Sequence, residues 1–394
     1  MMKKIFTLIS ISFSLSVVKA DYWTQKANFP GIGREMPSSF VISNKGYITC
    51  GSSLNDLWEY DSNANMWTQK ANYPGNPRWL AVGFSINNKG YCGTGGYPIS
   101  YNDFWEYDPV TDVWTQKAIF AGSLRWGAAG FSIGSKGYLG CGSSGTVLLN
   151  DFWEWDQLTN IWTQKSSLPG LPRRQPVGFS LNGKGYISTG NSQSGYLNDI
   201  WEFDPALNTW NQKANLPGVP RQDAAAFSIC DKGYVGTGES PLLNDFWQFD
   251  PVLNQWIQKT NFAGTSRDDC AYFSIGSKGY IGLGQDNSGL PIDFWEYTPD
   301  SICATGIEEI SNNNFQFSIA PNPASQYAVI SWQSAENKKI EITVTGVEGK
   351  KVFEKQFQTT TSNFKLQTSN FPKGIYFIEL NNGTEKAIKK FIKI

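Results

Sequence analysis

A unit of 44 to 48 residues is repeated six times along this chain, and no other feature restricts the possible folds as strongly. Each copy contains Lys-Gly-Tyr, then an Asp-x-Trp element, and then a second Trp that mostly lies within Trp-Thr-Gln-Lys. The second Trp recurs at Trp23, Trp67, Trp114, Trp162, Trp210 and Trp256. A repeat of this length is typical of propellers, solenoids and arrays, in which each unit packs against its neighbours.

Each unit is predicted to form four short strands. Segments such as Asp-Phe-Trp-Glu-Tyr-Asp, around Trp105, alternate polar and apolar residues with a period of two, as half-buried strands do. Asp-Pro pairs such as Asp108-Pro109 favour the turns between them. No long apolar stretch has a helical period. Four antiparallel strands in each of six units predict an all-β fold, a six-bladed β-propeller over residues 21–305.

The ends of the repeat region predict how the ring closes. The first Trp-Thr-Gln-Lys copy, Trp23 to Lys26, precedes any complete unit, whereas the last unit ends near Tyr297 without one. We therefore expect residues 22–26 to add the missing outer strand of the sixth blade. This closure removes an open sheet edge, which would invite aggregation.

Residues that are identical in all six units are expected to serve packing, because packing is what all six units have in common. They include twelve Trp and a Phe that follows six residues after a repeated Arg. The Arg, expected to bridge neighbouring blades, stands at Arg34, Arg78, Arg125, Arg173, Arg221 and Arg267. The repeated Asp, expected to pair with Arg or to stabilise turns, stands at Asp56, Asp103, Asp151, Asp199, Asp245 and Asp293.

The positions that vary directly after the repeated Arg are the candidates for ligand binding. They lead into the innermost strand at one opening of the central channel, and loops on a rigid scaffold commonly carry function. The candidate residues are Glu35, Trp79, Trp126, Arg174, Gln175, Gln222, Asp223, Asp268 and Asp269. Exposed Trp beside carboxylates and amides suits glycan stacking or an aromatic peptide anchor, to which the loop residues Tyr97, Tyr101 and Tyr196 would add. The alternative is that Trp79 and Trp126 only cap the ends of their blades.

Composition excludes several kinds of chemistry. The chain has no His, which excludes a Ser-His-Asp triad, a His general base and His-ligated metals. A net charge of −1 gives no reason to expect nucleic acid as a partner. Glu35, Asp223, Asp268 and Asp269 offer carboxylates for acid–base chemistry, whereas adjacent acids alone make no calcium cage. No cofactor or metal is predicted.

The six Cys do not form a disulfide framework by spacing. Cys50 and Cys141 occupy equivalent places in two units, where other units carry Thr or Leu, and the remaining four stand at unrelated places. No C-x-x-C pair indicates a metal site. We expect small buried thiols that replace Thr or Ala.

The order of Arg, small-residue strand, Gly-Tyr, single Gly, Asn-Asp-x-Trp, Asp-Pro and Trp resembles the kelch repeat from about Asp21 to Pro299. Only Gly95-Gly96 keeps the Gly doublet of that family, while Gly51 and its equivalents stand alone. The resemblance implies that the variable rim contacts ligand. Copper oxidase chemistry, known on such propellers, needs His and is excluded; a sugar epimerase or mutarotase stays open.

The first twenty residues are predicted to be a secretory signal peptide. Lys3 and Lys4 precede an apolar and hydroxyl-rich run, which ends at Val18-Lys19-Ala20. The run is shorter than the roughly 20 apolar residues that span a bilayer. We therefore expect an exported protein without a transmembrane segment in its mature chain.

The last eighty residues form a different module. Residues 306–316 are acidic and then Asn-rich, which predicts a linker, and 317–394 alternate again, which predicts a small β-sandwich of about seven short strands. Residues 317–394 carry 11 Lys, no Arg and 6 Glu, a net charge of +5. Residues 21–316 carry 19 basic and 28 acidic residues, a net charge of −9.

This module resembles the type A C-terminal sorting domain of the type IX secretion system, a β-sandwich of immunoglobulin-like form. The resemblance rests on Ser318 to Ala324, Gly349 to Val352, Lys373 to Phe377 and Lys389 to Lys393. It implies recognition at the outer membrane through the motif residues Pro321, Asn322, Pro323, Gly349, Lys350, Gly374, Ile375, Tyr376, Lys389 and Lys390. Secretion would run through the periplasm, with the secretion machinery as a partner.

The sequence thus predicts a secreted or surface-displayed kelch propeller that binds a glycan or a protein at its rim and is not an enzyme. Two alternatives stay open. One is a sugar epimerase, mutarotase or other glycan-processing enzyme, and the other is a structural surface component.

Overall fold

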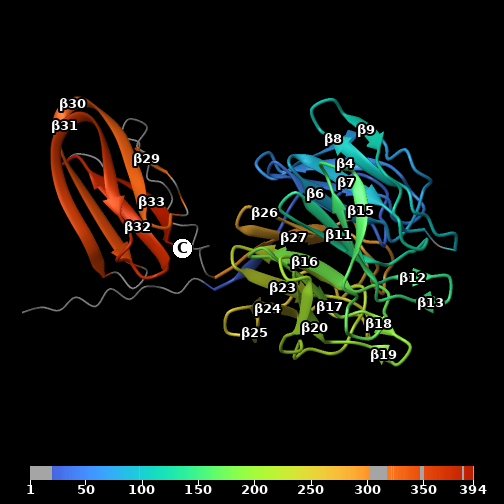
Figure 1. The fold of residues 1–394 in the computed structure, drawn as a ribbon. Helices are drawn as coiled ribbons and strands as arrows, with labels where there is room; N and C mark the ends of the chain where they lie inside the picture. The colour runs from blue at the N-terminus through green and yellow to red at the C-terminus, as the bar shows by residue number, and fades with distance from the viewer. Residues whose placement is uncertain are drawn as a thin grey trace, which may run out of the picture. The chain divides into compact units, whose positions relative to one another are not determined.

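The computed structural model describes residues 20–96, 98–300, 317–320, 322, 324–346, 350–383 and 386–393. The predicted linker, and the predicted signal peptide apart from Ala20, lie outside this part of the chain. The chain divides into two compact units, residues 1–303 and 304–394. Both are built from strands (Figure 1), and the described residues contain no helix.

The first unit contains six four-stranded antiparallel sheets. The innermost strands are β2 (Ser38–Ile42), β6 (Val82–Ile86), β10 (Ala129–Ile133), β16 (Val177–Leu181), β22 (Ala225–Ile229) and β26 (Ala271–Ile275). The second strands are β3 (Lys45–Thr49), β7 (Lys89–Gly93), β11 (Lys136–Gly140), β17 (Lys184–Ser188), β23 (Lys232–Gly236) and β27 (Lys278–Gly282). They carry the Lys-Gly-Tyr element.

The outer half of each sheet carries the Trp landmarks. The third strands are β4 (Leu57–Asp61), β8 (Phe104–Asp108), β14 (Phe152–Asp156), β20 (Ile200–Asp204), β24 (Phe246–Asp250) and β28 (Phe294–Thr298). The outermost strands are β5 (Met66–Lys70), β9 (Val113–Gln116), β15 (Ile161–Lys165), β21 (Thr209–Gln212), β25 (Gln255–Gln258) and β1 (Tyr22–Gln25). Two short hairpins, β12 (Ser143–Ser144) with β13 (Val147–Leu148) and β18 (Asn191–Ser192) with β19 (Gly195–Tyr196), lie in loops between second and third strands.

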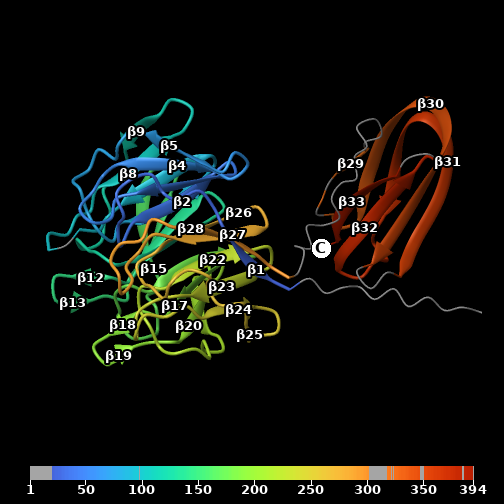
Figure 2. The same cartoon turned by 180° about the vertical axis from the view of Figure 1, so that it is seen from behind.

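The six sheets are arranged as the blades of a propeller (Figures 1 and 2). Each innermost strand contacts the innermost strands of both neighbouring sheets, and β2 contacts β26. The channel is a cavity of about 230 Å³ lined by residues of all six innermost strands. The predicted six-bladed propeller is confirmed.

The Gly of Lys-Gly-Tyr makes room for the neighbouring blade. A Cβ atom on Gly137 would overlap the ring of Phe84, the repeated Phe of the preceding blade. Phe84 is buried, and its ring stacks against Tyr91 with centroids 5.7 Å apart. The repeated Phe and Gly therefore form one packing contact at each boundary between blades.

Two further hydrogen bonds join each blade to the preceding one. The indole of Trp114 donates to the Ala71 carbonyl (2.9 Å), and the backbone N–H of Ala71 donates to Asp112 (2.9 Å). The same two bonds recur at the boundaries between the other consecutive blades, where Asn takes the place of Asp112. These contacts explain why the outer Trp and the Asn or Asp two residues before it are repeated.

Strand β1 completes the sixth sheet. Tyr22 to Gln25 pair antiparallel with β28, so this blade is built from the two ends of the repeat region. Trp23 donates to the Thr260 carbonyl (3.1 Å), and the Thr260 N–H donates to Asp21 (2.9 Å). The closing boundary therefore has the same two bonds as the others.

The repeated Arg stabilises its own unit through its side chain. Arg125 is buried and binds Asp151 of the same unit through both Nη atoms (2.6 and 2.7 Å), and it also donates to the Cys141 carbonyl. The expectation that the Arg side chain bridges blades is therefore wrong. Its backbone carbonyl does bridge: the Gly95 N–H of the preceding unit donates to the Arg125 carbonyl (2.8 Å). The expected Arg–Asp pairing is present in all six units.

Five of the six Cys lie in the described residues. Cys50, Cys92, Cys141 and Cys270 are buried free thiols, as expected. Cys230 is disulfide-bonded, so the expectation of free thiols throughout is wrong for this residue. Cys230 lies in the turn between β22 and β23, at a position where the six units do not share one residue type. Cys303 lies outside the described residues.

The described residues of the second unit form five strands: β29 (Phe317–Ala320), β30 (Tyr327–Gly346), β31 (Lys351–Gln367), β32 (Gly374–Asn381) and β33 (Lys386–Lys393). Two of them are long, and their register shifts between Gln333 and Lys338. The first half of β30 pairs with β29, and the second half with β32. The expected seven short strands are thus replaced by a long hairpin that contributes to both layers.

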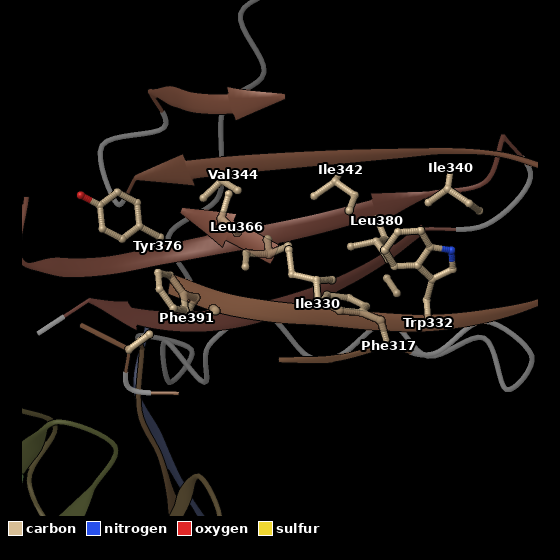
Figure 3. Close-up of a cluster of buried hydrophobic side chains, with 14 residues drawn as sticks. Phe317, Ile330, Trp332, Ile340, Ile342, Val344, Leu366, Tyr376, Leu380 and Phe391 are labelled. Carbon is tan, nitrogen blue, oxygen red and sulfur yellow. The ribbon is translucent and has the colours of Figure 1, made fainter. Parts of the chain in front are cut away.

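The core of this unit lies between those layers. Figure 3 shows Ile330 and Trp332, from the first half of β30, facing Ile340, Ile342 and Val344 from its second half. All of these side chains are buried. This arrangement confirms the predicted small β-sandwich.

Candidate functional site

One end of the propeller channel is formed by the two residues that follow each repeated Arg. We call this end the mouth. Six of its residues, one per blade, have positive φ angles between 54° and 62°: Met36, Leu80, Gly127, Gln175, Asp223 and Asp269. Only one of them is Gly, so this left-handed backbone costs energy at five positions. Because it recurs in every blade, it belongs to the construction of the repeat.

These six residues, the mouth ring, form a closed circle of backbone hydrogen bonds. Each N–H donates to the carbonyl of its counterpart in the preceding blade, with distances from 2.7 to 3.4 Å, and Met36 closes the circle on Asp269. The ring fixes the backbone of the mouth. Variation between the units is therefore expressed in side chains on a rigid frame, which favours precise binding.

A cavity of about 250 Å³ opens above part of this ring. We call it the mouth pocket. It is lined by Glu35, Met36, Trp79, Leu80, Trp126, Arg174, Gln175 and Gln222. Six of the nine residues predicted from the sequence thus line one cavity. Gln175 also lines a smaller cavity of about 90 Å³ at the ring, together with Asp223 and Asp269. Asp268 lines neither.

The two Trp differ in their surroundings. Trp79 is half-buried, whereas Trp126 is only 6% exposed because the guanidinium of Arg174 lies over its ring, 5.4 Å from the centroid. The expectation that both Trp are exposed is therefore wrong for Trp126. The apolar wall that a ligand can reach consists of Trp79 with Met36 and Leu80.

The opposite side of the mouth is polar. Gln222 donates through Nε2 to Glu239 (2.6 Å), which lies in the loop after the second strand of the fifth blade. Tyr196 lies beside Glu239, and burial together with that carboxylate raises the pKa of Tyr196. The guanidinium of Arg78 lies over the ring of Tyr101, 4.3 Å from the ring centroid, so Tyr101 belongs to the scaffold. Tyr97 lies outside the described residues.

Asp223 and Asp269 form a buried carboxyl pair in the mouth ring. The two side chains are hydrogen-bonded to each other, and Gln175 donates to Asp223 (2.8 Å). Burial, together with the charges of Asp268 and Glu239, raises the pKa of Asp223 to about 8. Burial and the neighbouring Asp223 raise the pKa of Asp269 well above its ordinary value. The pair therefore holds a proton at neutral pH, as two close carboxyls do.

Asp268 carries the third raised pKa. Burial, with the Glu239 and Glu35 carboxylates nearby, raises it to about 6. Asp268 is 7% exposed, and its Oδ1 has no hydrogen-bond partner among the described residues. The same holds for Gln222, which is also 7% exposed and whose Oε1 is unpartnered within the described part of the chain. Unpaired buried acceptors are costly, so the mouth contains binding capacity that the protein itself does not use.

Sequence reasoning missed three residues of this site. Glu239 was not considered because it follows the second strand and not the repeated Arg. Met36 and Leu80 stand at the variable positions after the repeated Arg but are not among the predicted site residues, although they line the pocket. The signal available in the sequence was the position of Glu239. It follows the repeated Thr237 by two residues, in a loop that recurs beside the rim.

The described residues contain no group of three Cys, Asp or Glu side chains placed to hold a metal ion. In the same part of the chain, no helix has the length and apolar character needed to cross a membrane.

The motif residues of the second unit lie partly at one sheet edge. Tyr376 is buried and pairs with Phe391, while Ile375 and the stretch around Lys389 and Lys390 lie on the paired strands β32 and β33. Asn322 donates to the Lys390 carbonyl (2.8 Å). Gly374 begins β32, and Lys350 is exposed directly before β31. Pro321, Pro323 and Gly349 lie outside the described residues.

Comparisons with known proteins bear on both units. Residues 318–394 match the family described as secretion system C-terminal sorting domain. This match confirms the predicted sorting domain and indicates export by type IX secretion to the cell surface or extracellular space. No curated protein matches the chain.

Among solved structures, the one titled "Structure of YjhT" is similar to this chain. The similarity has a TM-score of 0.59 and covers 68% of this chain and 96% of that chain, at 16% sequence identity. At this identity the likeness extends to the fold alone, which it confirms.

Proposed function

We propose that this chain is an exported binding protein that captures a glycan or protein ligand in the mouth pocket, without catalysing a reaction. The observation that carries the proposal is a pair of buried acceptors, Gln222 Oε1 and Asp268 Oδ1, which have no hydrogen-bond partner among the described residues. Gln222 lines a cavity with an apolar wall, and Asp268 stands at the equivalent position of the next blade. A convergent set of polar groups in an apolar pocket is the usual form of a ligand site.

The size of the pocket limits what enters it. Ligand pockets for drug-sized molecules measure roughly 300–1,000 Å³, and the mouth pocket measures about 250 Å³. It therefore takes one sugar ring or one amino-acid side chain. The rest of a glycan or protein would lie on the rim outside.

A purely structural role explains the mouth less well. Packing would be satisfied by apolar residues in the ring, as Met36 and Leu80 show in two blades. Buried carboxyls without a countercharge reduce stability. Residues that lower stability are typically retained where a site needs them.

A second function, processing of a glycan, is favoured by the Asp223–Asp269 pair. One carboxyl that keeps its proton beside one that can lose it is the arrangement used for acid–base catalysis. The pair lies at the ring, beneath the pocket wall formed by Gln175. Turnover of a sugar that Asp223→Asn abolishes would favour this function over binding alone.

The proposal is tested with glycan and peptide arrays probed by the full exported chain and by Trp79→Ala. We expect binding that Trp79→Ala weakens at least tenfold. Leu158→Ala, a change of an exposed residue in a turn between third and fourth strands, serves as the control and should bind as the parent does. Binding that both variants retain would reject the mouth as the site.

A further inference from the structure

We propose that the mouth pocket recognises a basic side chain of a peptide or protein, lysine or arginine, whose cationic group lies between Gln222 and Asp268 and whose apolar stem packs against Trp79. The inference rests on the proposed function, because it uses the same pocket, and it adds the chemical class of the ligand.

The first step concerns hydrogen-bonding capacity. The amide of Gln222 is oriented by its donation from Nε2 to Glu239, so its oxygen is the atom left over. This oxygen and Asp268 Oδ1 are both acceptors, and neither has a partner among the described residues. A group that satisfies them must donate hydrogen bonds. Ammonium and guanidinium groups donate three and five, and they accept none.

The second step concerns charge. Five carboxyl groups surround this side of the mouth, those of Glu35, Asp223, Glu239, Asp268 and Asp269. The pocket lining holds one cation, Arg174, whose guanidinium lies over Trp126. Asp268 occupies the position between those of Gln222 and Glu35 around the ring of blades, and both neighbours line the pocket. A bound cation would supply a countercharge to these carboxyl groups, which have no ion-pair partner in the described part of the chain.

The third step concerns the stem. Trp79, Met36 and Leu80 form an apolar wall in the same cavity. Lysine and arginine bury their methylene chains along apolar surface while the charged end reaches a polar site. An amino sugar shares the ammonium group but presents hydroxyls to this wall. The wall therefore favours a basic side chain over an amino sugar.

The fourth step concerns long-range attraction. Residues 21–316 carry a net charge of −9. A negative surface of this kind raises the association rate of a basic partner at low salt, and added salt reduces the effect. Binding through this pocket should therefore weaken as ionic strength rises.

The experiment titrates the full chain with the peptide Ac-Gly-Gly-Lys-Gly-Gly-NH₂ and with its Nε-acetylated form, followed by calorimetry or Trp fluorescence. Acetylation removes the charge and keeps the stem. We expect at least tenfold weaker binding of the acetylated peptide, and comparable binding of the Arg peptide. Equal binding of the lysine and acetyl-lysine peptides would overturn the inference. So would binding of glucosamine by a chain that binds neither basic peptide.

Two variants that each remove one carboxylate locate the site. Asp268→Asn should weaken binding of the lysine peptide at least tenfold. Asp231→Asn should leave it unchanged, because Asp231 is exposed in the β22–β23 turn at the other end of the blade. Melting curves establish that both variants are folded. Equal affinities of the two variants would contradict the placement of the cation.

The outcomes separate this inference from the proposed function. If the arrays identify a neutral ligand whose binding depends on Trp79 while the basic peptides do not bind, the cation is rejected and the mouth remains the binding site. If no ligand depends on Trp79, both are rejected.

Discussion

The same residue type behaves in opposite ways in two regions of the propeller. Asp245 and Asp223 both belong to the fifth unit, and both are largely buried. Burial raises the pKa of Asp245, but hydrogen bonds and charge from Arg221 outweigh it and hold that pKa below its ordinary value. Asp223, in the mouth, has no basic partner among the residues that the structure describes, and burial raises its pKa to about 8.

This difference separates scaffold from site without knowledge of the ligand. The scaffold pairs each repeated, buried Arg with an Asp that recurs in every unit. The mouth varies from unit to unit. Within the described residues it retains two acceptors without a hydrogen-bond partner, Gln222 Oε1 and Asp268 Oδ1, and carboxyls that are not paired with a basic side chain. Raised carboxyl pKa values in a concave site are a recognised sign of function, and the paired Asp residues supply an internal reference for them.

The largest effect is expected from opening the ring. Deletion of Asp21 to Lys26 removes β1 with its pairing to β28 and the two bonds to Thr260. Loss of a packed Trp alone costs about 3–5 kcal/mol, so we expect the melting temperature to fall by about 10 °C or more. Differential scanning calorimetry measures it. An unchanged melting curve would show that the closing strand is dispensable.

Two adjacent Arg residues test the scaffold against the mouth. Arg173→Met leaves Asp199 without its bidentate partner, and breaking a buried pair in this way costs about 3–5 kcal/mol. Arg174→Met removes only the cation over Trp126, for which we expect less than about 1 kcal/mol. Chemical denaturation compares the two. Equal losses would mean that the repeated Arg has no special role.

Removing the charge should change stability in opposite directions at the two Asp residues of the fifth unit. Asp245→Asn weakens a charge-assisted pair and should lower stability by about 1–3 kcal/mol. Asp223→Asn removes a carboxyl whose ionisation is unfavourable in the fold, so it should raise the melting temperature at pH 8.5. A loss of stability in both variants would contradict the distinction.

The last prediction is a dependence of stability on pH. Between the ordinary pKa of 3.8 and about 8, folded Asp223 holds a proton that the unfolded chain has released. Stability from this group is therefore greatest at low pH and is lost as pH rises toward 8. The chain has no His, so few other side chains titrate between pH 5.5 and 8.5. Asp223→Asn should flatten the fall in melting temperature across this range, whereas Asp231→Asn should not.

The sequence predicts the features that are repeated and misses those that depend on a single contact between units. Six copies of one pattern determine the strands, the blade number and the Arg–Asp pairs. The burial of Trp126 depends on Arg174, which belongs to the next blade and is not a repeated residue. Glu239 reaches the mouth from a loop, and no periodicity places that loop.

The C-terminal unit shows the same limit. Its motifs identify the sorting domain, which the family match confirms. Its alternating segments also predict a sandwich. The lengths of β30 and β31 are not evident from the alternation, because a strand that passes from one layer to the other is indistinguishable in sequence from two separate strands.

The most direct test of the account is a carboxyl ¹³C NMR titration of the chain labelled at Asp, with signals assigned through single Asp→Asn variants. We predict that Asp268 titrates near pH 6 and that the Asp223–Asp269 pair releases its proton near pH 8, while the pKa values of Asp56, Asp151 and Asp245 lie below the ordinary value of an Asp carboxyl. Titration of all six carboxyls below pH 4 would contradict the claim that the mouth differs from the scaffold.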